Sequence, residues 1–295
     1  MRRLKTIAIV GVGLIGGSFA LAMRRAGAVT RIVGADRDAQ ALERAASLGV
    51  IDTATQSASE AAAGADLVFV AVPVRAIGPV LHDVALGLGP DAVVTDAGST
   101  KSDVVRTAGA ELRDRFPRFV PGHPIAGRES SGVDAAVPDL FRGARVVLTP
   151  EAATSPEAIA LVRSCWEACG ARVTGMPALA HDRVFASVSH LPHLLAFALV
   201  SEIVSRPDAA ELLGFAAGGF RDFTRIAGSS PEMWRDIALA NREALLEEID
   251  RYGARVAVFR ELVARGDASG LQRLMTEARN ARRAWTGGKR SSSDE

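Results

Sequence analysis

The sequence predicts an α/β fold in residues 1–176 and an all-helical domain in residues 177–286. Three observations lead to this division. A strand-like run near the N-terminus breaks into a glycine-rich turn and a helical pattern, β-branched runs alternate with helical stretches as far as Met176, and the strand signal largely disappears after Pro177. Such alternation is typical of a parallel sheet with helices on both faces. The polar residues 287–295 are expected to form a disordered tail.

The glycine-rich turn is the most informative segment. Residues 6–10 form a short β-branched apolar run, as a buried parallel strand requires, and a GxGxxG pattern follows it directly. In such a turn the first glycine permits a tight bend, the second lets a pyrophosphate approach the backbone, and the third allows the helix to pack closely on the strand. The free N–H groups at the helix N-terminus attract phosphate. We therefore predict a dinucleotide site formed by Gly11, Gly13, Leu14, Ile15 and Gly16.

The end of the second predicted strand, residues 31–36, favours NAD over NADP as the cofactor. Asp36 stands about 20 residues after the glycine turn, where a carboxylate accepts hydrogen bonds from an adenosine ribose and repels a 2′-phosphate. Arg37 follows it, and an arginine at this place accommodates that phosphate. NADP therefore stays an alternative cofactor.

Further cofactor contacts are expected where other strands end. One buried strand stops at Val72 and Pro73, and another is followed by Ser99 and Lys101. Because ligands of parallel sheets bind beyond the carboxyl ends of the strands, Val72, Pro73 and Ser99 are candidate cofactor-binding residues. A serine at this place is also a common helix N-cap, and Lys101 alone would be a solvated lysine.

A histidine-containing loop is predicted at the same edge of the sheet. Residues 119–132 form a loop by composition, and no helical or strand periodicity explains His123 as a core residue. Imidazole is the side chain best suited to exchange a proton near neutral pH. His123 is therefore a candidate for proton transfer, whereas Arg128 and Glu129 of the same loop would be surface charges.

Composition and charge exclude several classes of function. The 295 residues allow about two domains at ~150 residues each, and a formal net charge of +1 creates no broad field for nucleic acid or a membrane surface. We expect no membrane-spanning run, which needs about 18 apolar residues, and no signal peptide. The two cysteines, Cys165 and Cys169, are expected to pack as thiols in a reducing compartment. We therefore expect a cytoplasmic protein that binds neither nucleic acid nor membrane.

The second half of the chain is predicted to be helical. Two further strands are expected within residues 139–150 and 172–176, the latter at the edge of the sheet. Helical patterns then cover residues 181–204, 209–215, 231–265 with a possible break, and 268–284. By analogy with other folds, an all-helical second domain closes the substrate side of the cleft and carries a dimer interface.

Two polar clusters stand out in the helical half. His190 and His193 lie three residues apart at the start of an apolar helix, and because no third ligand is evident we expect no metal site. A glycine-flanked segment contains Arg221, Asp222 and Arg225. Arginine is the side chain best suited to hold a carboxylate through two parallel hydrogen bonds, so this segment is a candidate for binding an acid.

Five segments occur in a characteristic order, at residues 11–18, 96–101, 122–129, 189–193 and 220–227. Together they resemble the prephenate/arogenate (cyclohexadienyl) dehydrogenase family of tyrosine biosynthesis, and the HPIAGRE and SHLPH stretches are much more specific than the glycine turn. The resemblance implies a Rossmann-like domain, a helical dimerisation and substrate domain, and a homodimer. It also implies oxidative decarboxylation of prephenate to 4-hydroxyphenylpyruvate with NAD.

The resemblance further implies roles for individual residues. In the implied reaction, C4 of the substrate ring loses a hydride and its hydroxyl loses a proton, while CO2 leaves C1 and the ring becomes aromatic. Neutral His123 would accept a hydrogen bond from the hydroxyl, Ser99 would orient hydroxyl, imidazole and nicotinamide, and Arg225 would hold a substrate carboxylate. The remaining family positions would shape the substrate pocket or position the arginine: His190, His193, Trp234, Glu129 and Asp222.

Arg128 departs from the family pattern, since many members have a small hydroxyl residue there. The extra charge favours dianionic prephenate as the substrate, with arogenate or dual specificity as an alternative. A β-hydroxyacid dehydrogenase is a second alternative, but residues 180–201 contain no lysine to serve as its catalytic group. A non-enzymatic NAD-sensing module would need neither His123 nor a buried pair of Arg221 and Arg225.

Overall fold

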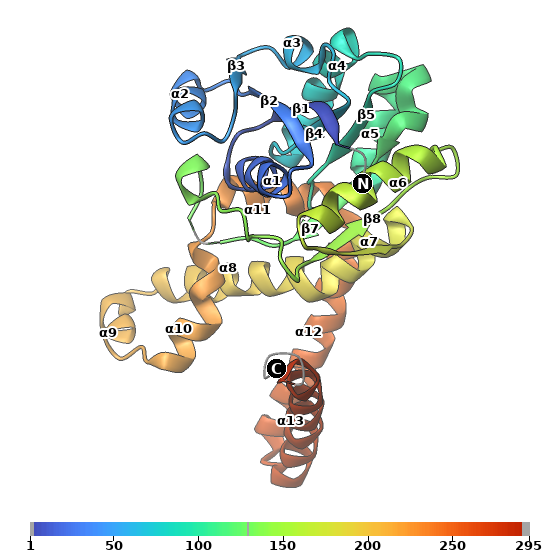
Figure 1. The fold of residues 1–295 in the computed structure, drawn as a ribbon. Helices are drawn as coiled ribbons and strands as arrows, with labels where there is room; N and C mark the ends of the chain where they lie inside the picture. Colours follow the sequence, from blue (N-terminus) through green and yellow to red (C-terminus); the bar gives the residue numbers. More distant parts are fainter. Residues whose placement is uncertain (1–2, 129, 291–295) are drawn as a thin grey trace. The chain divides into compact units, whose positions relative to one another are not determined.

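The computed structural model describes residues 3–128 and 130–290. The chain forms two compact units, Met1–Leu245 and Leu246–Glu295, and each is considered by itself. The first unit contains the strands of the described chain and every candidate site residue. Figure 1 gives the path of the chain from the N-terminal strand to the C-terminal helices.

A six-stranded sheet forms the centre of the first unit. Its order is β3-β2-β1-β4-β5-β6, and every neighbouring pair is parallel. This is the strand order of a Rossmann fold, in which the chain leaves β1 in one direction and later returns to its other side, so that a crevice opens beyond β1 and β4. The predicted fold class is confirmed. The strands are β1 Leu4–Val10, β2 Val29–Ala35, β3 Thr53–Thr55, β4 Leu67–Val70, β5 Val93–Asp96 and β6 Phe119–Val120.

Helices cover both faces of this sheet (Figure 1). One face packs against α1 (Leu14–Arg25), α2 (Ala39–Ser47) and α6 (Pro156–Ala168). The other face packs against α3 (Ala58–Ala62), α4 (Ile77–Gly87) and α5 (Ser102–Leu112). Because both faces are buried, β4 is apolar along its whole length and β1 is apolar from Ile7 to Val10, as expected of a parallel sheet.

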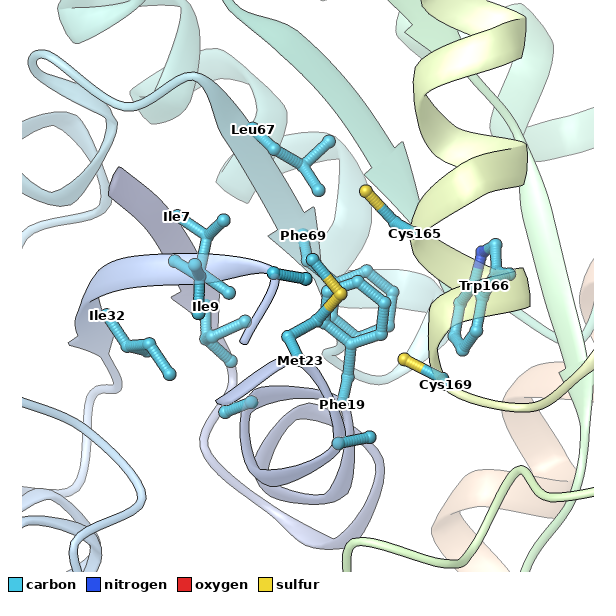
Figure 2. Close-up of a cluster of buried hydrophobic side chains, with 14 of the residues drawn as sticks. Ile7, Ile9, Phe19, Met23, Ile32, Leu67, Phe69, Cys165, Trp166 and Cys169 are labelled. Atoms are coloured by element: carbon cyan, nitrogen blue, oxygen red, sulfur yellow. The ribbon is translucent and has the colours of Figure 1, made fainter. Parts of the chain in front are cut away.

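Aromatic side chains fill the core on the first face (Figure 2). The ring centroid of Phe19 lies 4.4 Å from that of Phe69 and 4.8 Å from that of Trp166. Cys165 and Cys169 lie in the same layer as free, buried thiols, and burial raises the pKa of Cys165 to about 12. The cysteines therefore contribute packing, as predicted.

A second, three-stranded sheet was not predicted. β7 (Gly122–Ile125) pairs antiparallel with β8 (Arg145–Leu148), which pairs parallel with β9 (Arg172–Gly175). Two expectations were therefore wrong: residues 119–132 are not all loop, and residues 172–176 do not edge the main sheet. Gly122 and Pro124 are poor strand formers, but β7 is an edge strand, where the missing N–H of a proline is tolerated.

The chain after β9 is helical, as predicted. A π-helical turn, η4, interrupts the helix expected over residues 181–204. Pro192 has no N–H to donate to the carbonyl of Val188 four residues earlier, so the chain widens just before it. The elements are α7 Ala178–Phe185, η4 Ala186–His190, α8 Leu191–Val204, α9 Ala209–Gly214, α10 Gly218–Thr224, η5 Arg225–Gly228, α11 Pro231–Ala240, α12 Arg242–Arg265 and α13 Ala268–Arg290; short 3-10 turns are η1 Val74–Ala76, η2 Arg113–Arg118 and η3 Val133–Ala135.

One helical stretch is longer and more apolar than predicted. Ala178–Val204 contains an 18-residue window of mean hydropathy 1.6, long enough to cross a membrane by length and composition, and 28% of that window is buried. The sequence prediction considered uninterrupted apolar runs, and this stretch is interrupted by charged and histidine side chains. His181 and Asp182, which interrupt the run, are buried and hydrogen-bonded within the first unit.

The C-terminal helix extends further than predicted. α13 continues to Arg290, so residues 287–290 are helical where a disordered tail was expected from residue 287. Helix propagation is less costly than nucleation, and a polar end can therefore extend a helix already formed. Residues 291–295 lie outside the described residues.

Candidate active site

The glycine turn leaves open space where a dinucleotide phosphate would lie. Gly11 has φ of +95°, and a Cβ there would overlap the carbonyl of Ala71. A Cβ on Gly16 would overlap the backbone of Gly11, whereas a Cβ on Gly13 would meet no atom within 4 Å. Helix α1 then begins with Gly13 as its N-cap and without a side-chain cap. This cradle fits the pyrophosphate of NAD.

Asp36 links the glycine turn to the end of β2. Its Oδ2 accepts a hydrogen bond from the N–H of Val12 at 3.0 Å, and its Oδ1 accepts one from the N–H of Asp38 at 3.1 Å. The carboxylate is thus held at the rim of the cradle with lone pairs left for a ribose. Arg37 is exposed next to it.

Val72 and Pro73 follow the end of β4 on the other side of the glycine turn. Val72 is half-buried, and its Cγ1 would lie 3.0 Å from a Cβ on Gly11, while Pro73 is exposed. The turn η1 that begins after Pro73 contacts α11. This side of the cradle therefore faces the helical part of the first unit.

His123 is half-buried on strand β7 and uncharged at neutral pH. Its Nδ1 lies 2.8 Å from Nε2 of His181, and its ring packs against Phe185 with centroids 4.8 Å apart. Burial, and secondarily electrostatic interactions with His181, Lys101 and His190, hold the pKa of His123 well below its usual value. The lone pair needed to accept a proton is therefore present at pH 7.

A histidine and an aspartate missed by the sequence analysis lie behind His123. Both come from α7: Nδ1 of His181 is 2.9 Å from Oδ1 of Asp182, and both side chains are buried. The Asp182 carboxylate also accepts hydrogen bonds from the backbone N–H groups of Lys101 and Ser102, each at 2.8 Å. An adjacent His-Asp pair in a helical pattern was the only signal for them.

Lys101 is a buried structural residue, so the expectation of a solvated lysine was wrong. Its Nζ lies 2.5 Å from Oδ2 of Asp96 and donates to the carbonyl of Gly122 at 2.8 Å. Asp96 is also fully buried and accepts backbone hydrogen bonds from Gly98 and Gly122. A buried carboxylate needs a positive partner, and Lys101 provides it for Asp96. Through its hydrogen bond to Gly122, the ion pair also joins the loop that contains Ser99 to the strand that contains His123.

Ser99 lies on this loop, and its backbone is next to His190 of η4. Ser99 is half-buried, and its backbone is one of the groups that act on the pKa of His190. That pKa is lowered to about 4, chiefly by burial. Nδ1 of His190 accepts a hydrogen bond from Nδ2 of Asn241 at 3.1 Å, and the same amide group donates to the carbonyl of Asp182 at 2.8 Å.

His193 and Trp234 form a stacked pair beside His190. Their ring centroids are 3.6 Å apart, and Nδ1 of His193 donates to the carbonyl of Ser189 at 2.8 Å. Within the described residues, Nε2 of His190 and Nε1 of Trp234 are buried without a hydrogen-bond partner. A cavity of about 210 Å³ opens here and is lined by His190, Leu194, Phe197, Pro231, Trp234, Arg235, Ala238 and Leu245.

The charged candidates lie at the surface of the single chain. Arg225 is exposed at the start of η5, close enough to His193 to contribute to its lowered pKa, which burial mainly causes. Arg221, Asp222 and Arg128 are exposed as well. In the single chain Arg221 and Arg225 are therefore not a buried pair, and α10 and η5 pack against α8. Glu129 lies outside the described residues.

Residues 3–128 and 130–290 contain no group of three histidine, cysteine, aspartate or glutamate side chains placed to hold a metal ion. His190 and His193, whose three-residue spacing is metal-like, each use Nδ1 in a hydrogen bond to the protein.

Comparison with known proteins identifies the family. A family model described as the nucleotide-binding domain of prephenate dehydrogenase matches residues 19–175, and one described as its dimerization domain matches residues 177–277. The chain belongs to the prephenate dehydrogenase family. The resemblance found in the sequence is confirmed, and the chain is an NAD-dependent oxidoreductase of this family.

Individual relatives agree over nearly the whole chain. A cyclohexadienyl dehydrogenase of Zymomonas mobilis is 38% identical over 95% of this chain and 96% of its own length. A prephenate dehydrogenase of Bacillus subtilis is 38% identical over 94% of this chain and 75% of its own. The crystal structure of Aquifex aeolicus prephenate dehydrogenase with hydroxyphenyl propionate and NAD+ superposes with a TM-score of 0.89 at 38% identity, covering 94% of this chain and 97% of that one.

Proposed function

We propose that this chain catalyses the oxidative decarboxylation of prephenate to 4-hydroxyphenylpyruvate with hydride transfer to NAD, as a cytoplasmic homodimer. The family membership supports the reaction, and the Aquifex relative binds NAD+ together with a hydroxyphenyl compound. The observation that carries the proposal in this chain is an uncharged, half-buried His123 backed by a fixed polar network, which reaches Lys101 beyond the carboxyl end of β5 in the sheet that carries the glycine cradle.

The glycine turn and the strand ends would hold the cofactor. The N–H groups at the start of α1 would bind the pyrophosphate beside Gly13, and Asp36 would accept hydrogen bonds from the adenosine ribose. Leu14, Ile15, Val72 and Pro73 would line the path toward the nicotinamide. NAD, when bound, accepts the hydride that leaves C4 of the substrate.

His123 and Ser99 would act on the reacting hydroxyl. The imidazole would accept the hydroxyl proton as the hydride departs, a role that needs the neutral ring. The Ser99 hydroxyl, on the loop fixed by the pair Lys101 and Asp96, would orient the substrate hydroxyl against the imidazole. Loss of CO2 and aromatisation of the ring then make the step irreversible.

The substrate carboxylates and the ring would be held by the helical part. Arg225 would bind a carboxylate through its guanidinium, with Asp222 and Glu129 as positioning residues. The buried Nε1–H of Trp234, which lacks a partner in the described chain, suits an oxygen atom of the substrate.

Dimerisation is proposed for the helical half. The matched dimerization domain supports it, and so do the large apolar side chains that α8 exposes on the single chain. We keep the division proposed from the sequence, with residues 1–176 for NAD and residues 177–286 for the substrate and the interface.

Two alternatives differ in the substrate side chain and in the cofactor. The cyclohexadienyl dehydrogenase of Zymomonas and an arogenate dehydrogenase of Synechocystis, 31% identical with a TM-score of 0.80 over 95% of this chain and 99% of that one, favour testing arogenate. Exposed Arg37 beside Asp36 is the reason to test NADP.

The proposal is tested by NADH formation with purified protein, supplying prephenate or arogenate with NAD or NADP. We expect the highest kcat/KM with prephenate and NAD, and a fall in kcat of roughly 100-fold or more in His123→Asn. Turnover of arogenate alone would preserve the chemistry and reverse the substrate assignment. Activity that His123→Asn leaves intact would overturn the assignment of the proton acceptor.

A further inference from the structure

His123 is the first member of a three-residue hydrogen-bonded chain. Its Nδ1 lies 2.8 Å from Nε2 of His181, and Nδ1 of His181 lies 2.9 Å from Oδ1 of Asp182. Of these three residues the proposed reaction uses only His123, so it does not explain why a second imidazole and a carboxylate are buried behind it. A distance between two nitrogen atoms does not show which of them carries the proton. The hydrogen-bond partners of each residue, taken in order from Asp182, assign the protons.

The protons are ordered from the carboxylate outward. Oδ1 of Asp182 accepts from the N–H of Lys101 and Oδ2 accepts from the N–H of Ser102, so the group acts as an ionised acceptor. These hydrogen bonds, with the one from His181, hold the pKa of Asp182 below its usual value although burial opposes them. The hydrogen bond between His181 and Asp182 therefore requires a proton on Nδ1 of His181.

The remaining proton position follows from the neutrality of both rings. Burial lowers the pKa of His181, so at neutral pH this ring has one proton, on Nδ1, and a lone pair on Nε2. The contact at 2.8 Å then needs a donor from His123, and that donor is its Nδ1–H. Neutral His123 has no other proton, which leaves the lone pair on Nε2, the nitrogen directed away from His181.

We propose that His181, held by Asp182, is a positioning residue that fixes the Nδ1–H tautomer of His123 and so makes Nε2 the atom that accepts the substrate hydroxyl proton. This inference rests on the proposed function, in which His123 accepts that proton. Other charged or titratable groups around the two rings are Asp96 at the end of β5, Lys101 from the β5–α5 loop and His190 from η4. Lys101 and Asp96 form a closed ion pair.

The surroundings make this chain rigid enough for the role. His181 is fully buried, and its ring packs against those of His123 and Phe185, with centroid distances of 5.0 and 4.4 Å. Asp182 cannot rotate without losing the two N–H groups at the start of α5. An imidazole held in one tautomer and one orientation is ready for proton transfer without rearrangement, whereas the wrong tautomer presents an N–H to the substrate hydroxyl.

The test compares two substitutions of His181 with a substitution of a histidine that takes no part in these hydrogen bonds. His181→Leu removes the acceptor for Nδ1–H of His123, and we expect kcat with prephenate and NAD to fall roughly 10- to 100-fold, as when the outer partner of a functional histidine is lost, with little change in KM. His181→Gln retains a side-chain acceptor and is expected to recover most of that loss. His82→Gln, at an exposed histidine paired with Glu111, is the matched control and should leave kcat unchanged.

The tautomer itself is measured by ¹⁵N NMR of the histidine rings in the full-length protein. The chain has five histidines, and His123→Asn identifies the signal of His123. We expect protonated Nδ1 and unprotonated Nε2 in the wild type, and a shift toward protonated Nε2 in His181→Leu. A wild-type His123 with its proton on Nε2 overturns the inference even if His181→Leu does not fold.

The outcomes separate this inference from the proposed function. An enzyme that turns over prephenate, loses activity in His123→Asn and keeps full kcat in a folded His181→Leu would retain the function and refute the positioning role. An enzyme indifferent to His123→Asn would refute the proposed function and the inference with it.

Discussion

The stability of this protein should depend on pH through His190. The side chain is 2% exposed, and burial lowers its pKa to about 4, whereas a histidine in an unfolded chain titrates near 6.5. Because the folded-state pKa lies below the unfolded one, the unfolded state binds more protons between these values. The contribution of His190 to the free energy of unfolding is therefore complete above pH 6.5 and is lost as the pH falls toward 4.

The size of the effect follows from the same numbers. One pKa unit corresponds to about 1.4 kcal/mol, so the gap between 6.5 and about 4 represents about 3 kcal/mol in total. About 2 kcal/mol of this should already be lost at pH 5. The neighbouring histidines 123, 181 and 193 also have lowered pKa values and add to the slope.

Urea unfolding at pH 7 and pH 5 measures this loss, and His190→Gln isolates it. Glutamine retains an acceptor for Asn241 but does not titrate, so the variant should lose about 2 kcal/mol less than the wild type between the two pH values. His82→Gln, which changes an exposed histidine, is the control. Equal losses in wild type and His190→Gln would refute the statement that His190 is buried in the uncharged form.

Three further predictions concern the cofactor cradle, the buried ion pair and the substrate charge. Gly13→Ala should fold normally, because its Cβ meets no protein atom, but should raise KM for NAD about tenfold by crowding the pyrophosphate. Gly16→Ala should instead lower the melting temperature, because its Cβ overlaps the backbone of Gly11. Lys101→Met should cost about 3 kcal/mol or more in urea unfolding, since it leaves the Asp96 carboxylate buried without its cation; a cost below about 1 kcal/mol would contradict this. Arg128→Ser should raise KM for prephenate more than KM for arogenate, and equal effects would show that Arg128 does not act on the substrate charge.

The main fold was predictable because its signals are local. The glycine spacing, the β-branched runs and the acidic residue at the end of β2 each follow from the backbone geometry of one strand–turn–helix unit. The second sheet was not predictable in the same way. Its strand β7 contains Gly122 and Pro124, and only the pairing of this edge with β8, distant in sequence, makes it a strand.

The residues of the candidate site that belong to recognisable sequence motifs could be predicted. His123, Ser99, His190, His193 and Trp234 lie in one region, as the contacts of the network indicate. The residues behind them could not be found from spacing. Lys101 and Asp182 have ordinary neighbours in sequence, and their importance comes from buried contacts across the fold, such as that of Asp182 with the start of α5, 80 residues earlier in the chain.

The two cysteines have a practical consequence for studying this protein. Thiol reagents attack the thiolate, and Cys165 and Cys169 are buried in the aromatic core, with the pKa of each raised by that burial. A disulfide reagent can therefore modify these two cysteines only in molecules in which this core has opened. The rate of labelling then reports the opening equilibrium of the α/β part without an added probe, and the enzyme should keep its activity through changes in the thiol–disulfide balance of its surroundings.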